Sequence, residues 1–290
     1  MELIPNFDID SFLRIIWVSK EAKSMWESAL SRVNQLVQEL EVLSVTHDQR
    51  PCSWQTISED TLIDQTKHWE DQGLVAIPIK RVGPFEGFAH KHTPVRQDAI
   101  NNVCVIVSKK YEDAKRYRVA FEKNDNVTQG LLLGFPECCC KFFEEMWAEG
   151  YYDPIWQAAI NTVGNVEERF IHLRKGEVHP YSNSALRYVG LRLSFHINHS
   201  FNCKESIRIG EERIKLAEEV NPQVTTILKA LLEMPFSWNV CHGIAVVRTP
   251  IFYIVTSSVP SKFQHVVEVD GDFIPKESSR GVTYPFTLVS

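Results

Sequence analysis

Two short apolar runs decide the fold class of this chain: residues 74–79 read LVAIPI, and residues 103–107 read VCVIV. Both are rich in β-branched residues, as buried strands tend to be. Similar runs return near the other end of the chain, at residues 243–247, 251–256 and 264–269. Helical signals dominate between the two groups, from Tyr111 to about Leu232, and Asn221 with Pro222 marks a helix start within that stretch. The order predicts an α+β fold with a mainly antiparallel sheet and a central helical segment.

The N-terminal region carries a helical pattern and then a polar stretch. Apolar residues recur at helical spacing from Phe12 to about Leu43, which predicts one or two amphipathic helices. Residues 44–66 are polar and irregular, which is typical of a linker or surface loop. We therefore predict an N-terminal helical segment and linker over residues 1–66, and a compound α+β metal-binding domain over residues 67–290.

Composition restricts the class of protein. The formal net charge of −6 gives no global electrostatic reason to bind nucleic acid, so only a local basic groove would serve that purpose. The sequence has no basic leader, and no apolar run approaches the roughly 20 residues of a membrane span, so we expect a cytoplasmic protein without a membrane partner. Seven cysteines, three of them adjacent, do not form a disulfide framework in a reducing compartment. The thiols are therefore expected to be free, buried or metal-bound.

Cysteine and histidine gather at two points of the helical middle. Residues 134–140 read GFPECCC, and residues 196–203 read HINHSFNC. Thiolates and imidazoles at two separated points are what Zn²⁺, Fe²⁺ or copper requires, because folding can bring one ligand pair from each point. The two clusters predict a divided metal site.

The first cluster is predicted to lie at a helix start. Pro136 suits the first turn of a helix, and the charge of Glu137 complements the positive end of the helix dipole. A helix N-terminus favours the thiolate form of cysteine, which binds metals. Successive helical residues point about 100° apart, so one or two of the three cysteines can face one ion. Cys139 shares a face with apolar residues and is predicted to be the most buried.

The second cluster is predicted to have the same local construction. Asn202 and Glu205 match a capping box, which would make Cys203 the first residue of a helix. His199 lies four residues before Cys203, and His196 three residues further back. The predicted metal ligands are Cys138, Cys139, His196, His199 and Cys203. The predicted metal is zinc, with iron as the alternative.

The same stretches resemble an uncharacterised group of bacterial and archaeal proteins that carry G-F/Y-P-x-C-C and, downstream, H-x-x-C-x-x-x-C-x-x-S. The matching residues are 134–139 and 196–206. The resemblance covers about a quarter of the chain. It implies no activity. His199 stands where that pattern has cysteine, an exchange that favours zinc or mononuclear iron over an iron–sulfur cluster. A weaker similarity is to the cysteine-rich metal site of nitrile hydratases, whose metal activates water. Those enzymes use C-x-x-C-S-C, whereas this chain has three adjacent cysteines.

A loop before the helical middle supplies further candidates for catalysis. His90 and His92 stand two residues apart, so in an extended segment their side chains project to the same side, and Glu86 precedes them. Together with Glu137, these residues are the predicted catalytic acids and bases. The glycines and proline of the same loop fit a plain surface turn equally well.

These features predict a metal-dependent enzyme of the hydrolase or hydratase type. Metal-activated water would add to a carbonyl, nitrile or amidine carbon of a small molecule or a modified nucleobase, such as a planar nitrogen heterocycle. Three alternatives stay open: an iron or copper oxidase of a small molecule, a non-catalytic binding protein with a structural zinc site, and a thiol nucleophile without metal. Residue spacing specifies neither the oligomeric state nor a partner chain.

Overall fold

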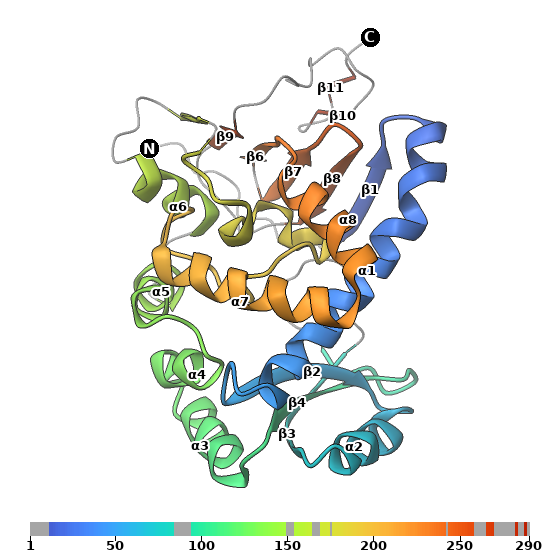
Figure 1. The fold of residues 1–290 in the computed structure, drawn as a ribbon, viewed down its shortest axis with the longest axis vertical. Helices are drawn as coiled ribbons and strands as arrows, with labels where there is room; N and C mark the ends of the chain where they lie inside the picture. Colours follow the sequence, from blue (N-terminus) through green and yellow to red (C-terminus); the bar gives the residue numbers. More distant parts are fainter. Residues whose placement is uncertain are drawn as a thin grey trace.

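The computed structural model describes residues 12–83, 94–148, 154–163, 169–174, 176–241, 243–257, 265–269, 282–283 and 287–288. These residues form an α+β fold with two main sheets, which confirms the predicted fold class. The smaller sheet lies at the bottom of Figure 1 and the larger sheet at the top, with the long helix α7 crossing between them.

The larger sheet has six strands in the order β1-β8-β7-β6-β9-β5. All its pairs are antiparallel except β5 with β9. The smaller sheet is antiparallel, in the order β2-β4-β3, and β10 pairs with β11 in a separate two-stranded sheet. The strands are β1 (Leu13–Trp17), β2 (Cys52–Ser58), β3 (Val75–Val82), β4 (Asn102–Ser108), β5 (Phe170–Leu173), β6 (Ser237–Cys241), β7 (Ile244–Arg248), β8 (Phe252–Ser257), β9 (His265–Val269), β10 (Val282–Thr283) and β11 (Thr287–Leu288).

Eight α-helices in the described residues connect and cover the sheets. They are α1 (Lys20–Thr46), α2 (Leu62–Asp71), α3 (Tyr111–Glu122), α4 (Asn126–Leu132), α5 (Glu137–Phe143), α6 (Pro154–Val163), α7 (Lys204–Val220) and α8 (Pro222–Leu232). A π-helical turn over Glu144–Ala148 continues α5, and two 3₁₀ turns, Pro180–Ser182 and Ala185–Val189, interrupt the irregular segment before α7. Asn221 caps α8 by accepting a hydrogen bond from Val224 N at 3.1 Å, with Pro222 at the first position, as predicted.

Three groups of buried apolar side chains hold these layers together. The largest combines one face of α1 with α6, α7, α8 and the six-stranded sheet, and its fully buried members include Leu40, Phe201 and Trp238. Two smaller groups lie around the three-stranded sheet, one of them including Val45 of α1. Helix α1 therefore contributes to the packing of both sheets. The predicted boundary after residue 66 falls inside α2.

The structure corrects the prediction for the N-terminal region. Residues 13–17 are not helical: they form β1, which pairs with β8 from the other end of the chain. Helix α1 begins only after Ser19, whose side chain accepts a hydrogen bond from Ala22 N at 3.1 Å. The predicted linker over residues 44–66 instead contains β2 and the beginning of α2, residues 62–66.

The predicted strands in the remaining described regions are confirmed. The runs at 74–79 and 103–107 correspond to β3 and β4, and the three C-terminal runs correspond to β7, β8 and β9. The helical middle is interrupted where helix was predicted, because Phe170–Leu173 forms β5 and residues 176–203 are irregular and largely buried.

A largely buried group of charged side chains lies where α1, the loop after it, the irregular segment before α7 and α7 itself meet. Glu41 accepts hydrogen bonds from Arg50 and Arg192, each at 3.1 Å, and Arg213 donates to the Leu193 carbonyl. The three guanidinium carbons lie 4.9, 5.8 and 3.8 Å from the centre of the Phe195 ring, for Arg50, Arg192 and Arg213 respectively. These four charged residues are called the arginine cluster below.

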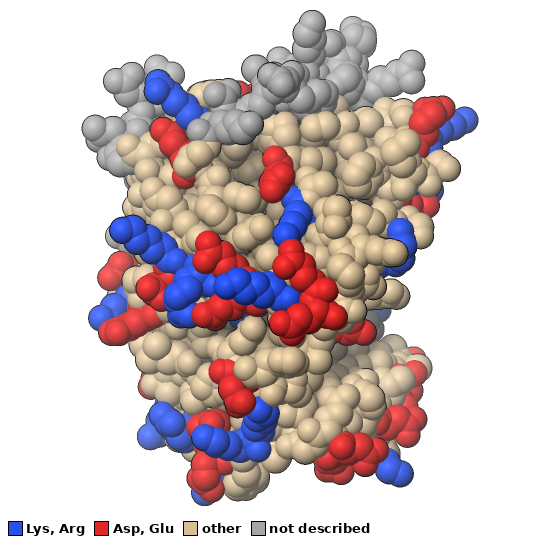
Figure 2. Space-filling view, in the orientation of Figure 1, with Lys and Arg blue, Asp and Glu red and all other residues tan. Residues whose placement is uncertain are grey.

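The outer face of α7 carries both signs of charge side by side, as the band across the middle of Figure 2 shows. Arg208 pairs there with Glu205 at 3.1 Å and with Glu212 at 2.6 Å. This face therefore presents no single-sign surface of the kind that binds nucleic acid. No described helix combines the length and the apolar character needed to cross a lipid bilayer.

Candidate metal centre

The turn before α5 places the three adjacent cysteines at a helix start, as predicted. Gly134 follows α4 with a φ of +75°, a backbone conformation that favours glycine. A side chain at this position would also approach the Cβ of Arg50 to 2.5 Å, so both the backbone and the packing require glycine. Pro136 is the N-cap of α5, and its carbonyl accepts hydrogen bonds from the backbone N–H groups of Cys139 and Cys140, both at 2.9 Å. Cys138 and Cys139 therefore lie in the first turn.

The second cluster lies on a loop that is anchored from several sides. Phe201 is fully buried in the main core, and its backbone N–H donates to Thr162 Oγ1 of α6 at 2.9 Å. Asn161, also on α6, donates to the carbonyl of His199 at 2.9 Å. Asn198 donates to the carbonyls of Ser182 and Ser200. These bonds fix the backbone on both sides of His199.

The predicted capping box before α7 is wrong. Asn202 accepts a hydrogen bond from the Ser200 hydroxyl instead of capping the helix, and Cys203 is itself the N-cap residue. Its carbonyl accepts the first helical bond, from Ile207 N at 3.0 Å. The consequence for the site is small, because Cys203 still lies where α7 begins.

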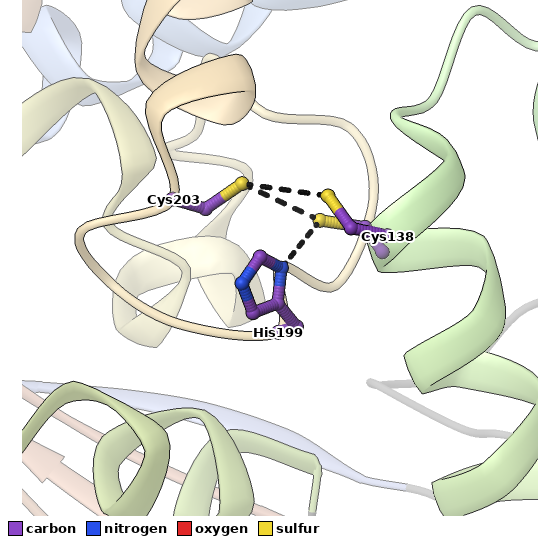
Figure 3. Close-up of side chains that lie close together, drawn as sticks. Cys138, His199 and Cys203 are labelled. Carbon is purple, nitrogen blue, oxygen red and sulfur yellow. Dashed lines mark hydrogen bonds between the residues drawn. The ribbon is translucent and has the colours of Figure 1, made fainter. Parts of the chain in front are cut away.

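Folding brings four predicted ligands together. The Sγ atoms of Cys138, Cys139 and Cys203 and one ring nitrogen of His199 all lie within 4.8 Å of one another, a group that can hold a metal ion. Figure 3 shows α5 and the loop before α7 presenting these side chains toward a common point. Cys203 Sγ lies 3.9 Å from Cys138 Sγ and 3.8 Å from Cys139 Sγ. His199 Nδ1 lies 3.4 Å from Cys139 Sγ.

These separations match the edges of a tetrahedron around zinc. With Zn–S bonds of about 2.3 Å and Zn–N bonds of about 2.0–2.1 Å, the S–S edge is about 3.8 Å and the S–N edge about 3.6 Å. The measured distances of 3.8, 3.9 and 3.4 Å fall within a few tenths of an ångström of these values. The remaining edges need to contract by at most about 1.2 Å from the 4.8 Å limit.

The four ligands differ in their access to solvent. Cys139 and Cys203 are buried, His199 is half-buried and Cys138 is exposed. Cys139 is the most buried of the three adjacent cysteines, at 1% exposure, as predicted. Solvent therefore reaches the group from the side of Cys138.

The three sulfurs divide their negative charge unevenly. A hydrogen bond from the Cys139 thiol lowers the pKa of Cys203 to about 4, and the same contact raises the pKa of Cys139. Burial raises the pKa of Cys138, and the nearby Cys203 thiolate adds to this effect. Three thiolates so close together repel one another unless a cation neutralises them. A divalent metal ion would remove this conflict, because metal ligation requires the deprotonated form of each thiol.

His196, the fifth predicted ligand, lies outside this group of four. Its Nε2 atom is hydrogen-bonded to Ser206 Oγ at 2.8 Å, and its ring packs against Phe135 with 5.1 Å between ring centres. Burial lowers the pKa of His196 to about 3, so the imidazole is neutral at pH 7. Ser206 in turn lies 3.6 Å from Cys139 Sγ. Ser206 is three positions after Cys203, which places both residues on the same side of α7. No role was predicted for Ser206 from the sequence.

Cys140 points away from the group. Its thiol donates to the Phe135 carbonyl at 3.7 Å, and it packs so closely on Gly130 that a side chain at position 130 would reach 2.5 Å from the sulfur. The helical rotation between neighbouring residues explains why two of the three cysteines converge and the third does not.

The structure describes one of the four predicted catalytic residues, Glu137. Glu137 forms an exposed ion pair with Lys141 at 2.7 Å, and its hydrogen bond with Lys141 lowers its pKa. Glu86, His90 and His92 lie outside the described residues.

Comparisons with protein-family models, with curated proteins and with solved structures find no match. The candidate centre therefore rests on its own geometry, and the two resemblances stay predictions.

Proposed function

We propose that this protein is a zinc protein in which Cys138, Cys139, His199 and Cys203 hold one tetrahedral Zn²⁺ ion. The observation that supports this most directly is three of the six distances among the four donor atoms: 3.8 and 3.9 Å between sulfurs and 3.4 Å between sulfur and nitrogen. Zinc has no preference for a geometry other than the one its ligands impose, and Cys₃His is one of its common ligand sets in structural sites.

The donor set also favours zinc over other metals. Three thiolates and one imidazole are soft or borderline ligands, and no described carboxylate belongs to the group, which argues against magnesium or calcium. An iron–sulfur cluster fits poorly, because cysteines bound to different irons point outward from the cluster and cannot all lie within 4.8 Å. A single iron ion in the same four-ligand shell is the remaining alternative, and it would colour the protein.

The first role of such an ion is to join distant parts of the chain. Cys138 and Cys139 begin α5, whereas His199 and Cys203 precede α7 about sixty residues later. Four protein ligands complete the coordination of zinc, which is the arrangement of structural sites. The proposed function is therefore a zinc centre that ties α5 to the irregular segment before α7 and stabilises the region between the two sheets.

A catalytic role is the second candidate, and the exposure of Cys138 favours it. If water replaced Cys138 on the ion, three protein ligands would remain, as in catalytic zinc sites, and the pKa of the bound water would fall toward neutrality. The protein would then be a hydrolase or hydratase acting on a carbonyl, nitrile or amidine carbon. Solvent access from the Cys138 side would admit a small molecule or an extruded nucleobase.

X-ray absorption at the zinc edge of the purified protein separates these candidates. The structural role predicts three sulfurs at about 2.3 Å and one nitrogen at about 2.0–2.1 Å. The catalytic role predicts two sulfurs with one nitrogen and one oxygen, and a spectrum unchanged by Cys138→Ala. A shell of five or six oxygen and nitrogen atoms would contradict both. Visible absorption of the protein as isolated would identify iron in place of zinc.

A further inference from the structure

A chain of hydrogen bonds leads from one ligand of the candidate centre into the protein interior. Ser206 Oγ lies 3.6 Å from Cys139 Sγ and 2.8 Å from His196 Nε2. All three side chains are at least nine-tenths buried, with exposures of 0% for Ser206, 1% for Cys139 and 7% for His196. Water therefore does not compete for these bonds.

The second ring nitrogen of His196 indicates which atoms donate in this series of hydrogen bonds. His196 Nδ1 is buried and has no hydrogen-bond partner among the described residues. A buried N–H group without an acceptor is rarer in proteins than a buried acceptor without a donor. The single proton of the neutral ring therefore belongs on Nε2, which donates to Ser206 Oγ. The hydroxyl proton of Ser206 is then directed away from His196 and toward the sulfur.

We infer that Ser206 is a positioning residue of the metal centre: it donates a hydrogen bond to the Cys139 thiolate and is held in that orientation by His196. The inference rests on the proposed zinc site. It changes the role of His196 from the predicted ligand to the group that orients Ser206.

The packing around Ser206 and His196 supports the positioning role of Ser206. Ser206 occupies the first turn of α7, three residues after the ligand Cys203, and Phe135 packs against the His196 ring from the turn that precedes Cys138. The same two segments thus supply both the ligands and the groups that orient them. A complex of Zn²⁺ with three thiolates and a neutral imidazole carries one net negative charge. A hydroxyl donor in a dry site stabilises that charge, because hydrogen bonds to ionised acceptors are about twice as strong as neutral ones.

Metal affinity and sulfur electronics together test the inference. In Ser206→Ala we expect zinc affinity, measured by competition with a chromophoric chelator, to fall about 10- to 100-fold. We also expect the sulfur-to-cobalt charge-transfer band of the Co²⁺-substituted protein to move to lower energy, because a thiolate without its donor releases charge more readily. Ser206→Thr keeps the hydroxyl and should restore both values toward those of the wild type.

A matched pair at position 196 tests the orienting role and covers the case in which Ser206→Ala does not fold. His196→Phe keeps a ring against Phe135 but removes the donor, and should move the band in the same direction by a smaller amount. His196→Gln keeps an N–H donor and should lie closer to the wild type. A folded Ser206→Ala or His196→Phe protein with wild-type affinity and an unmoved band would overturn the inference alone. Failure of the wild type to bind zinc or cobalt would overturn the proposed zinc site and this inference with it.

Discussion

Two polar clusters in the described part of the chain, both largely buried, balance their charges in different ways. In the arginine cluster, Glu41 lies between Arg50 and Arg192, and the face of Phe195 provides further stabilisation. Burial alone would raise the pKa of Glu41, but the two guanidinium groups lower it below its usual range. The charges of this cluster are thus compensated, at least in part, by groups of the chain itself.

The candidate metal centre has no such internal compensation. Its four donor atoms, three sulfurs and one ring nitrogen, converge on one point. Its three sulfurs compete for a single negative charge, as the opposite pKa shifts of Cys139 and Cys203 indicate. The difference is that the carboxylate of the arginine cluster has its counter-charges within the chain, whereas the thiols and the imidazole form a donor set that can hold a metal ion.

Removal of the metal should have the largest effect. Structural zinc sites have apparent binding free energies of about 10–16 kcal/mol, and part of that is available to stabilise the folded chain. A strong chelator should therefore lower the melting temperature of the wild type by at least about 5 °C, and added Zn²⁺ should restore it. Differential scanning fluorimetry measures both shifts. Identical melting with and without the chelator, in protein shown to lose its metal, would contradict a stabilising role.

Removal of the one carboxylate in the arginine cluster should come next. Glu41→Gln leaves the buried guanidinium group of Arg50 and the partly exposed one of Arg192 without their counter-charge. Breaking a buried pair by removing one partner typically costs about 3–5 kcal/mol. Urea unfolding at a fixed zinc concentration measures this loss. Glu218→Gln is the matched control, because Glu218 pairs with Lys229 on the surface and such pairs contribute about 0–1 kcal/mol. A Glu41→Gln variant as stable as this control would show that the arginine cluster does not depend on the ion pairs of Glu41 with Arg50 and Arg192.

Acidification should destabilise the protein through His196. The unfolded histidine takes up a proton near pH 6.5, whereas the folded one does so only at about pH 3, so the unfolded state binds more protons between these values. The stabilisation is complete above about pH 6.5 and declines as the pH falls, by about 2 kcal/mol at pH 5. Urea unfolding of metal-free protein from pH 7.5 to 5 measures the decline. In His196→Phe the decline in unfolding free energy should be smaller by this contribution of His196. An equal decline in both proteins would contradict the prediction.

Glu137→Gln should have the smallest effect. The side chain is exposed and pairs with Lys141 at the surface, so we expect no measurable change in unfolding free energy and unchanged zinc affinity. Urea unfolding and chelator competition measure the two quantities. Loss of zinc in this variant would mean that Glu137 contributes to the centre in a way its position does not indicate.

The sequence predicted those parts of the fold that depend on local signals. The β-branched runs of β3, β4, β7, β8 and β9 identify themselves by composition, and Asn221 with Pro222 identifies a helix start by cap chemistry. Strand β1 could not be found in this way, because its partner β8 lies more than two hundred residues away and its apolar residues also fit a helical pattern. Strand β2 is rich in serine, glutamine and threonine, and only its pairing with β4 makes it a strand.

For the candidate site, too, local chemical signals could be predicted from the sequence, and tertiary contacts could not. The spacing of the two clusters led to all four residues that the structure brings together, because soft ligands at two separated points are a local chemical signal. His196 and His199 cannot be distinguished by residue type, and only the tertiary contact with Ser206 separates them. Likewise, the helical rotation limits the cysteine ligands to two, but the packing of Cys140 on Gly130 is what excludes that residue.

Metal content tests the central claim most directly. The measurement is elemental analysis of protein purified without a metal-affinity column, for the wild type and for Cys139→Ser, Cys203→Ser and Cys140→Ser, each shown to be folded by circular dichroism. Cys140→Ser is the matched control, because it removes a neighbouring buried thiol that points away from the group. We predict about one equivalent of zinc in the wild type and in Cys140→Ser, and a small fraction of that in the other two variants. A folded wild type without metal, or equal metal in all four proteins, would contradict the zinc centre.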